Sequence, residues 1–399
     1  MKTINNYRVK EKKVLLRVDL NVPVVNGRIT EKSRIYALKS TVKKLIENKN
    51  KIFLLSHFGR PNGQYNTKYS LEFICSTLIE ELGIKKIHFI NKFDNNEIKS
   101  IINKMDFGDV CLFENIRFHP GEEKNDLAFI KELSINFEIY INNAFSASHR
   151  EHASIVGITQ YLPSLAGDSL LEEIKNINLF INNPKKPNVA IIGGSKISTK
   201  INLLHNLIKF FDTIVIGGAM ANTFLYANEI NIGLSLVEKD LAKIAKLILE
   251  KAKNYNCKII LPIDVVCSNS MNDKSNIRHC DVQNILSDQM ALDLGNKTIQ
   301  LITQSILRTK MILWNGPLGA FEYKPFEFAT IEIANVIKNR AKILNIITLV
   351  AGGDTISAIK MAKAEKGFSY ISTAGGALLE WLEGKESPGF RALIENTID

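Results

Sequence analysis

Short apolar runs alternate along the whole chain with longer stretches in which apolar and polar positions are mixed. The runs are rich in Val, Ile, Leu and Phe, as in strands buried on both faces, and the stretches between them are typical of amphipathic helices. Strands that alternate with helices predict an α/β fold with parallel sheets. The runs lie at 12–23, 51–61, 109–122, 137–152, 188–194, 213–218, 311–319, 345–353 and 370–376.

The length of 399 residues exceeds what one hydrophobic core usually supports, so we expect two domains. The earlier runs end in loops that carry Arg or His, whereas the later ones end mostly in Gly pairs. The segment LAGDSLLEEIKNINLFINN between them predicts a single helix with an apolar stripe. We therefore predict a first domain at 1–166, and a hinge helix with the second domain at 167–383.

Composition and charge narrow the function classes. Apolar residues make up 45% and charged residues 23%, which is typical of a folded globular protein. The net charge of +10 suits anionic ligands, but the lysines are scattered and form no basic run interleaved with aromatics, which argues against nucleic acid. No apolar stretch is long enough for a membrane span and the start does not resemble a secretion signal, so we expect a cytoplasmic protein.

Arginine and histidine residues recur at the strand ends of the first half. Arginine suits carboxylates and phosphates because its fork makes two parallel N–H bonds to one anion. One such residue alone is more often a surface charge, but the recurrent set indicates an anion site. The set comprises Arg17, His57, Arg60, Arg117, His149 and Arg150, together with Arg34, which we expect on a following helix.

Asp19 and Asn21 follow the first strand in RVDLNVP. Both side chains can accept hydrogen bonds from ligand hydroxyls, or they can form an Asx turn before Pro23. Both interpretations stay open.

Gly pairs end most strands of the second half. A Gly pair between a strand and a helix lets backbone N–H groups approach a phosphate, although a single pair is usually a tight turn. Lys196 and Lys200 follow the first pair four residues apart, a spacing that predicts one face of a helix start and a shared anion. The alternative is two solvated lysines.

Asp354 and Thr355 stand where a helix N-cap is expected. Asp354 either caps that helix or holds Mg²⁺ on nucleotide phosphates, and Glu322 either binds a ribose or caps a turn. No P-loop, protein-kinase motif set or dinucleotide fingerprint is present.

Seven ordered motifs together resemble the phosphoglycerate kinase family from end to end. They are RVDLNVP (17–23), SHFGRP (56–61), ENIRFH (114–119), AFSASHR (144–150), GGSKISTK (193–200), WNGPLGAFE (314–322) and GGDT (352–355). The resemblance implies two Rossmann-like domains joined by a hinge, with 3-phosphoglycerate on the first domain and Mg-nucleotide on the second. It also implies that the tail at 384–399 packs back on the first domain, that the protein is a monomer, and that it transfers a phosphoryl group reversibly from 1,3-bisphosphoglycerate to ADP.

The family's functional positions carry over residue by residue. The resemblance implies substrate contacts for Asp19, Asn21, Arg34, His57, Arg60, Arg117 and Arg150. It implies nucleotide contacts for Lys196, Lys200, Gly295, Asn315, Glu322, Gly352, Gly353, Asp354 and Thr355, with Mg²⁺ on Asp354. As a hypothesis, Arg34 and Lys200 neutralise the transferred phosphoryl group, and closure of the hinge brings them together.

Four positions depart from the family pattern. The family usually has Asp where Asn143 stands, and Gly where Ser146, Ala351 and Ala374 stand. These departures leave a rival interpretation, a catalytically silent nucleotide-binding or scaffold protein with the same fold. A nicotinamide dehydrogenase is a second rival, against which the missing fingerprint argues.

Overall fold

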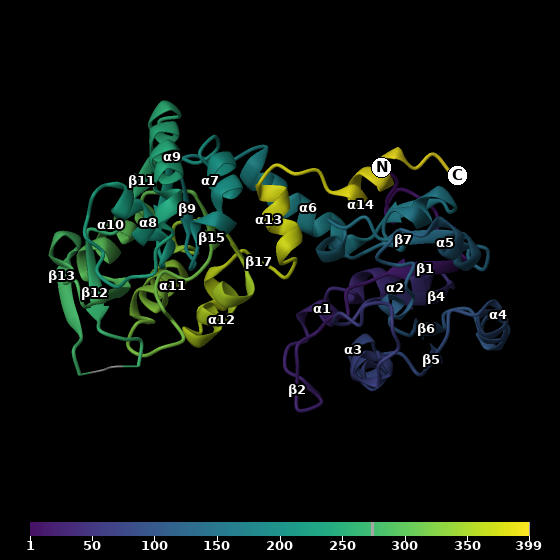
Figure 1. Ribbon diagram of the computed structural model, residues 1–399. Helices are drawn as coiled ribbons and strands as arrows, with labels where there is room; N and C mark the ends of the chain where they lie inside the picture. The colour runs from purple at the N-terminus through teal and green to yellow at the C-terminus, as the bar shows by residue number, and fades with distance from the viewer. Residues whose placement is uncertain (273–274, 399) are drawn as a thin grey trace. The chain divides into compact units, whose positions relative to one another are not determined.

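The computed structural model describes residues 1–272 and 275–398, which form two compact units (Figure 1). Unit 1 comprises Met1–Lys175 and the residues from Glu386 onward, and unit 2 comprises Asn176–Lys385. Helix α6 (Asp168–Ile181) crosses the boundary between them. The segment that the sequence indicated as one helix begins instead with a short strand, β8 (Ser164–Ala166), which pairs with β7 of unit 1.

Unit 1 is built on a six-stranded sheet in which every neighbouring pair is parallel. Its order is β5 (Ile87–Ile90), β6 (Val110–Phe113), β4 (Lys51–Leu55), β1 (Lys13–Arg17), β7 (Ile139–Asn142) and β8. The helices are α1 (Ser33–Tyr36), α2 (Lys39–Glu47), α3 (Cys75–Leu82), α4 (Asn95–Lys104), α5 (Leu127–Ser134) and α14 (Pro388–Glu395). A small hairpin, β2 (Val24–Val25) and β3 (Arg28–Ile29), precedes α1.

Alternate residues of the unit 1 strands enter two different layers of packing. Leu16 and Leu54 face one way and pack with Val42 and Leu45 of α2 in a single core cluster. Aromatic rings gather around Phe53, whose ring centroid lies 5.0 Å from that of Phe137 and 6.3 Å from that of Phe113. Because both faces are buried, the strands read as continuous apolar runs.

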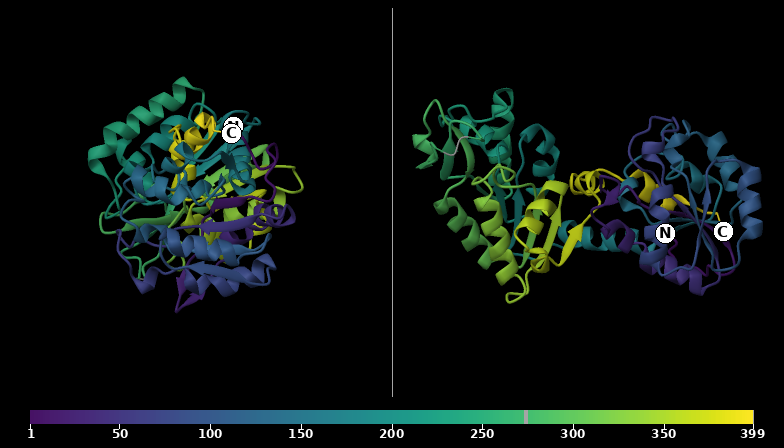
Figure 2. Two further views of the ribbon diagram at one scale, coloured as in Figure 1. Left: turned by 90° about the vertical axis from the view of Figure 1, so that its right-hand side faces the viewer. Right: turned by 90° about the horizontal axis from the view of Figure 1, so that it is seen from below.

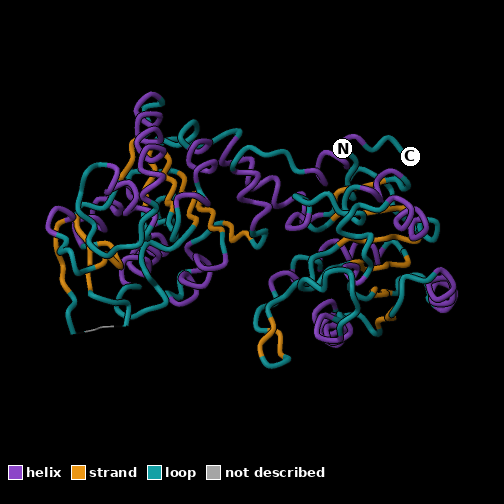
Figure 3. The backbone as a smooth tube through the Cα atoms, in the orientation of Figure 1, coloured by secondary structure: helices purple, strands orange, loops and turns teal. Residues whose placement is uncertain are grey.

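Unit 2 repeats this plan with a second six-stranded parallel sheet. Its order is β11 (Lys258–Ile260), β10 (Thr213–Ile216), β9 (Asn188–Ile192), β15 (Met311–Asn315), β16 (Ile347–Ala351) and β17 (Tyr370–Ser372). The helices are α7 (Ile201–Leu207), α8 (Met220–Ala227), α9 (Ala242–Asn254), α10 (Asn296–Leu307), α11 (Phe328–Arg340), α12 (Gly353–Met361) and α13 (Gly376–Leu382). Helices flank the strands of each sheet (Figures 2 and 3).

The predicted α/β class with parallel sheets is confirmed, and each apolar run contains a strand. Unit 2 also carries an antiparallel sheet that the sequence analysis did not identify. Its order is β13 (Arg278–Asp281), β12 (Asp264–Ser268) and β14 (Met290–Leu294).

The C-terminal segment belongs to unit 1. Asn396 donates through Nδ2 to the backbone oxygen of Thr159 at 2.7 Å, and its Oδ1 accepts from the N–H of Ser164 at 3.1 Å. Ser387 donates to the backbone oxygen of Ser148 at 2.8 Å. Within the described residues, no helix is long and apolar enough to cross a membrane.

Candidate active site

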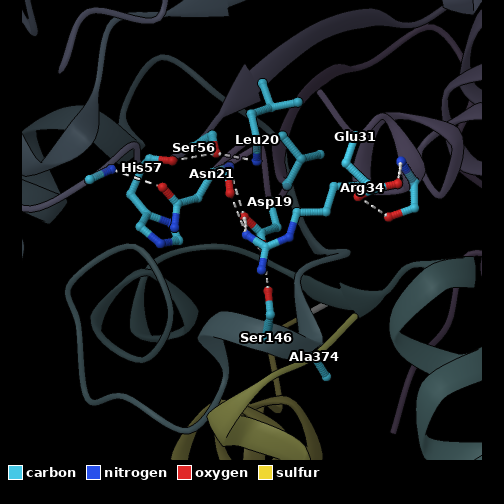
Figure 4. Close-up of polar contacts among 12 residues, drawn as sticks. Asp19, Leu20, Asn21, Glu31, Arg34, Ser56, His57, Ser146 and Ala374 are labelled. Atoms are coloured by element: carbon cyan, nitrogen blue, oxygen red, sulfur yellow. Dashed lines mark hydrogen bonds and ion pairs between the residues drawn. The ribbon is translucent and has the colours of Figure 1, made fainter. Parts of the chain in front are cut away.

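The carboxylate of Asp19 organises the loop after β1 (Figure 4). It accepts hydrogen bonds from Arg34 Nη1 at 2.9 Å, from the backbone N–H of Asn21 at 2.9 Å and from the hydroxyl of Ser146. The contact to Asn21 is the Asx turn that the sequence allowed. The ion pair with Arg34 adds a second role, because it fixes the direction of a cationic side chain.

Asn21 ties this loop to the one that follows β4. Its Oδ1 accepts the backbone N–H of Gly59 at 2.9 Å, and its backbone oxygen accepts from Arg34 Nη1 at 2.7 Å. The two strand ends are therefore held together by residues for which the family resemblance implies substrate contacts.

His57 is buried in the second of these loops. Arg17 Nη2 lies 3.2 Å from His57 Nδ1. Burial lowers the pKa of His57 well below its usual value, and the positive charges of Arg17, Arg150 and Arg34 lower it further. The imidazole is therefore neutral at physiological pH while cations surround it.

The remaining arginines of the predicted set differ in exposure. Arg117 is buried, donates through Nη1 to the backbone oxygen of Gly59 at 2.7 Å and pairs with Glu123 at 3.0 Å. Arg150 is half-buried and donates through Nε to His149 at 3.2 Å, whereas Arg60 is exposed. Unit 1 thus gathers cations at the carboxyl ends of β1, β4, β6 and β7, where parallel sheets bind ligands.

Two of the departures from the family pattern make defined contacts in unit 1. Ser146 donates its hydroxyl to Asp19. Asn143 accepts from the hydroxyl of Thr41 at 3.1 Å and from the N–H of Ser169 at 2.9 Å, in the first turn of α6. Neither residue displaces Arg34 from Asp19.

In unit 2, Lys200 is half-buried and donates to Oδ1 of Asn315 at the end of β15. Burial lowers the pKa of Lys200 to about 8, although Glu383 and Asp354 act in the opposite direction. Asn315 in turn donates through Nδ2 to the backbone oxygen of Ala351 at 2.9 Å. These contacts hold an ammonium at the carboxyl ends of two neighbouring strands.

Lys196 does not share a helix face with Lys200, contrary to what the spacing had predicted. A 3₁₀ turn at Ile197–Thr199 separates it from Lys200, which precedes α7. Because a 3₁₀ turn has about three residues per turn, side chains four apart do not share a face, so the prediction of one helix face was wrong. Lys196 is exposed.

The start of α12 also differs from the prediction. Gly352, with φ of 94°, is the N-cap, and Asp354 lies exposed in the first turn, so neither Asp354 nor Thr355 caps the helix. Thr355 instead accepts the backbone N–H of Gly316 at 2.7 Å. A Cβ on Gly352 would lie 2.9 Å from Asn315 Nδ2, so only glycine fits comfortably beside that side chain.

A cavity of about 580 Å³ opens beside these residues. Glu322 and Asp354 line it, as do Gly194, Ser195 and residues with apolar side chains, among them Leu234, Leu236, Met290 and Leu292. An apolar wall with a few polar groups is typical of a pocket for a flat ring system. The apolar wall was not predicted from the sequence, because part of it belongs to strand β14, which was not predicted either.

Glycine is needed at the Gly pairs for two distinct reasons. A Cβ on Gly193 would lie 1.9 Å from the backbone oxygen of Pro317, so this glycine lets two loops pack closely. Gly194, with φ of 127°, and Gly353 have nothing within 4 Å of a Cβ, so their backbones are open to a ligand. Gly295 lies outside the cavity lining, and a Cβ there would meet the carboxylate of Asp264 at 2.3 Å.

Comparison with known proteins decides the family. The family model described as phosphoglycerate kinase matches residues 4–385. The chain belongs to the phosphoglycerate kinase family. The phosphoglycerate kinase of Chelativorans sp. (strain BNC1) is 43% identical over 393 residues, covering 98% of both chains, and that of Sinorhizobium medicae (strain WSM419) is 45% identical over 378 residues, covering 95% of this chain and 94% of the relative.

The structure of phosphoglycerate kinase from Coxiella burnetii superposes with a TM-score of 0.90 at 34% identity, over 98% of both chains. The two parallel-sheet units are therefore the two Rossmann-like domains of this family. As a member of the phosphoglycerate kinase family, the protein is a kinase that transfers a phosphoryl group between 1,3-bisphosphoglycerate and ADP in glycolysis.

Proposed function

We propose that the protein binds 3-phosphoglycerate in unit 1 and Mg-nucleotide in unit 2, with Arg34 and Lys200 at the transferred phosphoryl group. The observation that carries this assignment is the contrast between the units. Unit 1 gathers arginines around a neutral, buried His57, whereas unit 2 combines a largely apolar cavity with a half-buried ammonium. These are the chemistries that a phosphorylated acid and a nucleotide require.

On the substrate side, Asp19 and Asn21 accept hydrogen bonds from ligand hydroxyls, and the cations bind carboxylate and phosphate oxygens. The cations of this site are Arg34, Arg60, Arg117 and Arg150. His57 contributes a neutral hydrogen-bond donor. The support is that Asp19 is buried and already oriented by Arg34, so the site needs little rearrangement before it binds.

On the nucleotide side, the base lies against the apolar wall, and the phosphates extend toward Gly353, Asp354 and Lys200. Among the described residues, no group of three or more His, Cys, Asp or Glu could hold a metal ion. The exposed carboxylate of Asp354 nevertheless fits Mg²⁺, because Mg²⁺ in nucleotide sites takes one or two carboxylates and completes its shell with phosphate oxygens and water. When bound, the ion would neutralise phosphate charge.

Phosphoryl transfer asks the protein mainly for alignment and charge stabilisation. The attacking oxygen of ADP is already ionised, so no strong base is needed. Arg34 and Lys200 supply positive charge to the equatorial oxygens as the group moves. They belong to different units, so neither unit contains the whole catalytic set.

A coupled assay tests the proposal. The protein is mixed with ATP, Mg²⁺ and 3-phosphoglycerate, and acyl-phosphate formation is followed through a reductase that consumes it. We expect turnover that is lost without Mg²⁺. Nucleotide binding without turnover would instead favour the scaffold interpretation.

Substitutions distinguish the proposed roles of Lys200 and Lys196. Lys200→Ala should lower kcat by roughly 10²–10³ with a much smaller change in KM, because its charge acts mostly in the transition state. Lys196→Ala is the matched control, since Lys196 is exposed, and its effect should fall on KM for ATP. Normal turnover by Lys200→Ala would refute the assignment.

We also propose a cytoplasmic monomer, which agrees with a glycolytic role. Size-exclusion chromatography with light scattering should report the mass of one chain. A stable dimer would contradict this.

A further inference from the structure

Next to the proposed substrate site lies a network of buried, hydrogen-bonded polar side chains to which no function has been assigned above. Glu122 has no exposed side-chain surface, yet burial does not leave it unpaired. Its Oε2 accepts the backbone N–H of Ser154 at 2.9 Å, and its Oε1 accepts the hydroxyl of Ser154 at 2.7 Å. His152 Nδ1 lies 3.6 Å from the same carboxylate.

The carboxylate fixes the direction of the serine hydroxyl. Burial by itself would raise the pKa of Glu122, but His152, Arg17 and Ser154 outweigh it and lower that pKa, so the group is ionised. An ionised carboxylate only accepts, so the single hydroxyl proton of Ser154 points toward Glu122. The lone pairs of Ser154 Oγ are then left for a donor on the other side.

That donor is Arg17, whose side chain is almost fully buried. Its Nε donates to Ser154 Oγ at 2.9 Å, and its Nη1 donates to the backbone oxygen of Val18. The remaining Nη2 lies 3.2 Å from Nδ1 of His57. The Arg17 guanidinium is thus committed to groups of the chain itself.

The N–H donors of Arg17 decide the tautomer of His57. A guanidinium has donors and no acceptor, so His57 Nδ1 must accept, and the ring proton must sit on Nε2. The titratable and charged groups that act on His57 are Arg17 from β1, Arg34 from α1, and Arg150 and His152 from the segment after β7. All of them disfavour a second proton on the ring.

We propose that Glu122, acting through Ser154 and Arg17, is a positioning residue that holds His57 in the neutral tautomer with its proton on Nε2. His57 then directs an N–H toward a substrate oxygen. Because the ring carries no charge, it does not strengthen the binding of substrate and product equally. This inference rests on the proposed function only in that His57 contacts the phosphoglycerate.

Glu122→Gln is the sharpest variant, because it keeps the volume and reverses the polarity of one contact. The glutamine oxygen can still accept the N–H of Ser154, but its NH₂ group would donate to the hydroxyl. The hydroxyl would then accept from both the amide and Arg17 Nε, so its proton would lose the carboxylate that oriented it and Arg17 would share its acceptor. Ser154→Ala interrupts the same hydrogen-bond network in a different way, because it removes the acceptor of Arg17 Nε.

Tyr140→Phe is the matched control. Its hydroxyl donates to the backbone oxygen of Ser154 at 2.7 Å, so the variant removes one buried hydrogen bond from the same segment. It leaves the links among Glu122, Ser154 and Arg17 in place. We expect lower thermal stability but an unchanged His57 tautomer.

The tautomer is read from ¹⁵N NMR of the full-length, histidine-labelled protein without substrate, with His57→Gln to assign the resonances. The wild type and Tyr140→Phe should show an unprotonated Nδ1 and a protonated Nε2. In Glu122→Gln and Ser154→Ala the two nitrogens should move toward average shifts, and KM for 3-phosphoglycerate should rise by roughly tenfold with KM for ATP unchanged.

Two results overturn the inference. A protonated Nδ1 in the wild type would do so without any variant, even where a variant does not fold. Folded Glu122→Gln and Ser154→Ala proteins with the wild-type tautomer and KM would do so as well. Failure of the proposed function looks different, because the wild type would then show the expected tautomer but no turnover in the coupled assay.

Discussion

At the scale of single residues, Lys200 shows how burial prepares a charge. The side chain is half-buried and in contact with Asn315, so desolvation weakens its hold on the proton. In the proposed assignment, a nucleotide phosphate beside Lys200 would restore the charged form. The ammonium would then be poorly solvated before the nucleotide binds and well paired afterwards, which would favour its interaction with the phosphoryl group.

The pH dependence of the free enzyme follows from this. Burial lowers the pKa of Lys200 from 10.5 to about 8, so the charged form predominates below pH 8 and is lost as pH rises through that value. We expect kcat/KM for ATP to fall above pH 8, because this parameter reports ionisations of the free enzyme. Initial rates from pH 6 to 10 measure it. In Lys200→Arg, whatever its absolute rate, the fall should disappear, since arginine stays charged; an identical profile would show that another group is responsible.

Ser146 is a departure from the family pattern whose effect can be measured. Its hydroxyl donates to Asp19, which holds Arg34, so Ser146→Gly removes one support of that ion pair. We expect a two- to fivefold rise in KM for 3-phosphoglycerate, corresponding to about 0.5–1 kcal/mol for one lost hydrogen bond. KM for ATP should not change. Equal KM values for both proteins would mean that Asp19 needs no third partner.

At the scale of elements, strands were predicted most reliably where burial on both faces alone determined the sequence pattern. The central strands of both parallel sheets are buried on two faces, so their apolar runs were plain, and their carboxyl ends marked where Arg17, Asp19 and Asn315 lie. The edge strands β5 and β11 are partly exposed and were not predicted. Strand β13, with the sequence RHCD, is partly exposed and has no such run, so the antiparallel sheet was missed. The apolar wall of the cavity was missed with it.

Local backbone geometry explains the other errors. Whether Lys196 and Lys200 share a face depends on a 3₁₀ turn of three residues, and periodicity cannot distinguish so short a turn from an α-helix. The N-cap of α12 is a glycine at positive φ rather than Asp354, because the side chain of Asn315 comes close to Gly352. That approach joins segments far apart in the sequence.

Asp293 connects two elements of unit 2 and makes their packing sensitive to pH. It lies on β14 and accepts the backbone N–H of Ala329 at the start of α11, at 2.9 Å. Burial raises the pKa of Asp293 from 3.8 to about 8, despite hydrogen bonds that favour the charged form. Between these values the folded state keeps a proton that the unfolded chain releases, so stability falls as pH rises.

Asp293→Asn tests this link, because asparagine can still accept from Ala329 and does not titrate. The midpoint of urea unfolding should decrease from pH 5 to pH 8 in the wild type and should change much less in the variant. Parallel pH dependences would show that Asp293 is ionised in the folded protein.

At the scale of the whole molecule, the excess of 51 basic over 41 acidic residues attracts anionic substrates, but salt limits its reach. At physiological ionic strength charges are screened beyond about 8 Å, so the cations at each site should matter more than the total. We expect kcat/KM for 3-phosphoglycerate to fall as NaCl is raised, with kcat less affected.

Two variants distinguish local from global charge. Lys243→Glu, on the exposed surface of α9 and outside both proposed sites, changes the net charge by two and should leave the salt dependence nearly unchanged. Arg60→Ala, also exposed, changes the net charge by only one but should flatten the salt dependence, because Arg60 belongs to the unit 1 cation set. If the larger change in net charge had the larger effect, the whole-molecule field rather than the local cluster would govern association. The comparison therefore separates a property of the composition from a property of the fold, since only the fold brings Arg60 and the other arginines to the same strand ends.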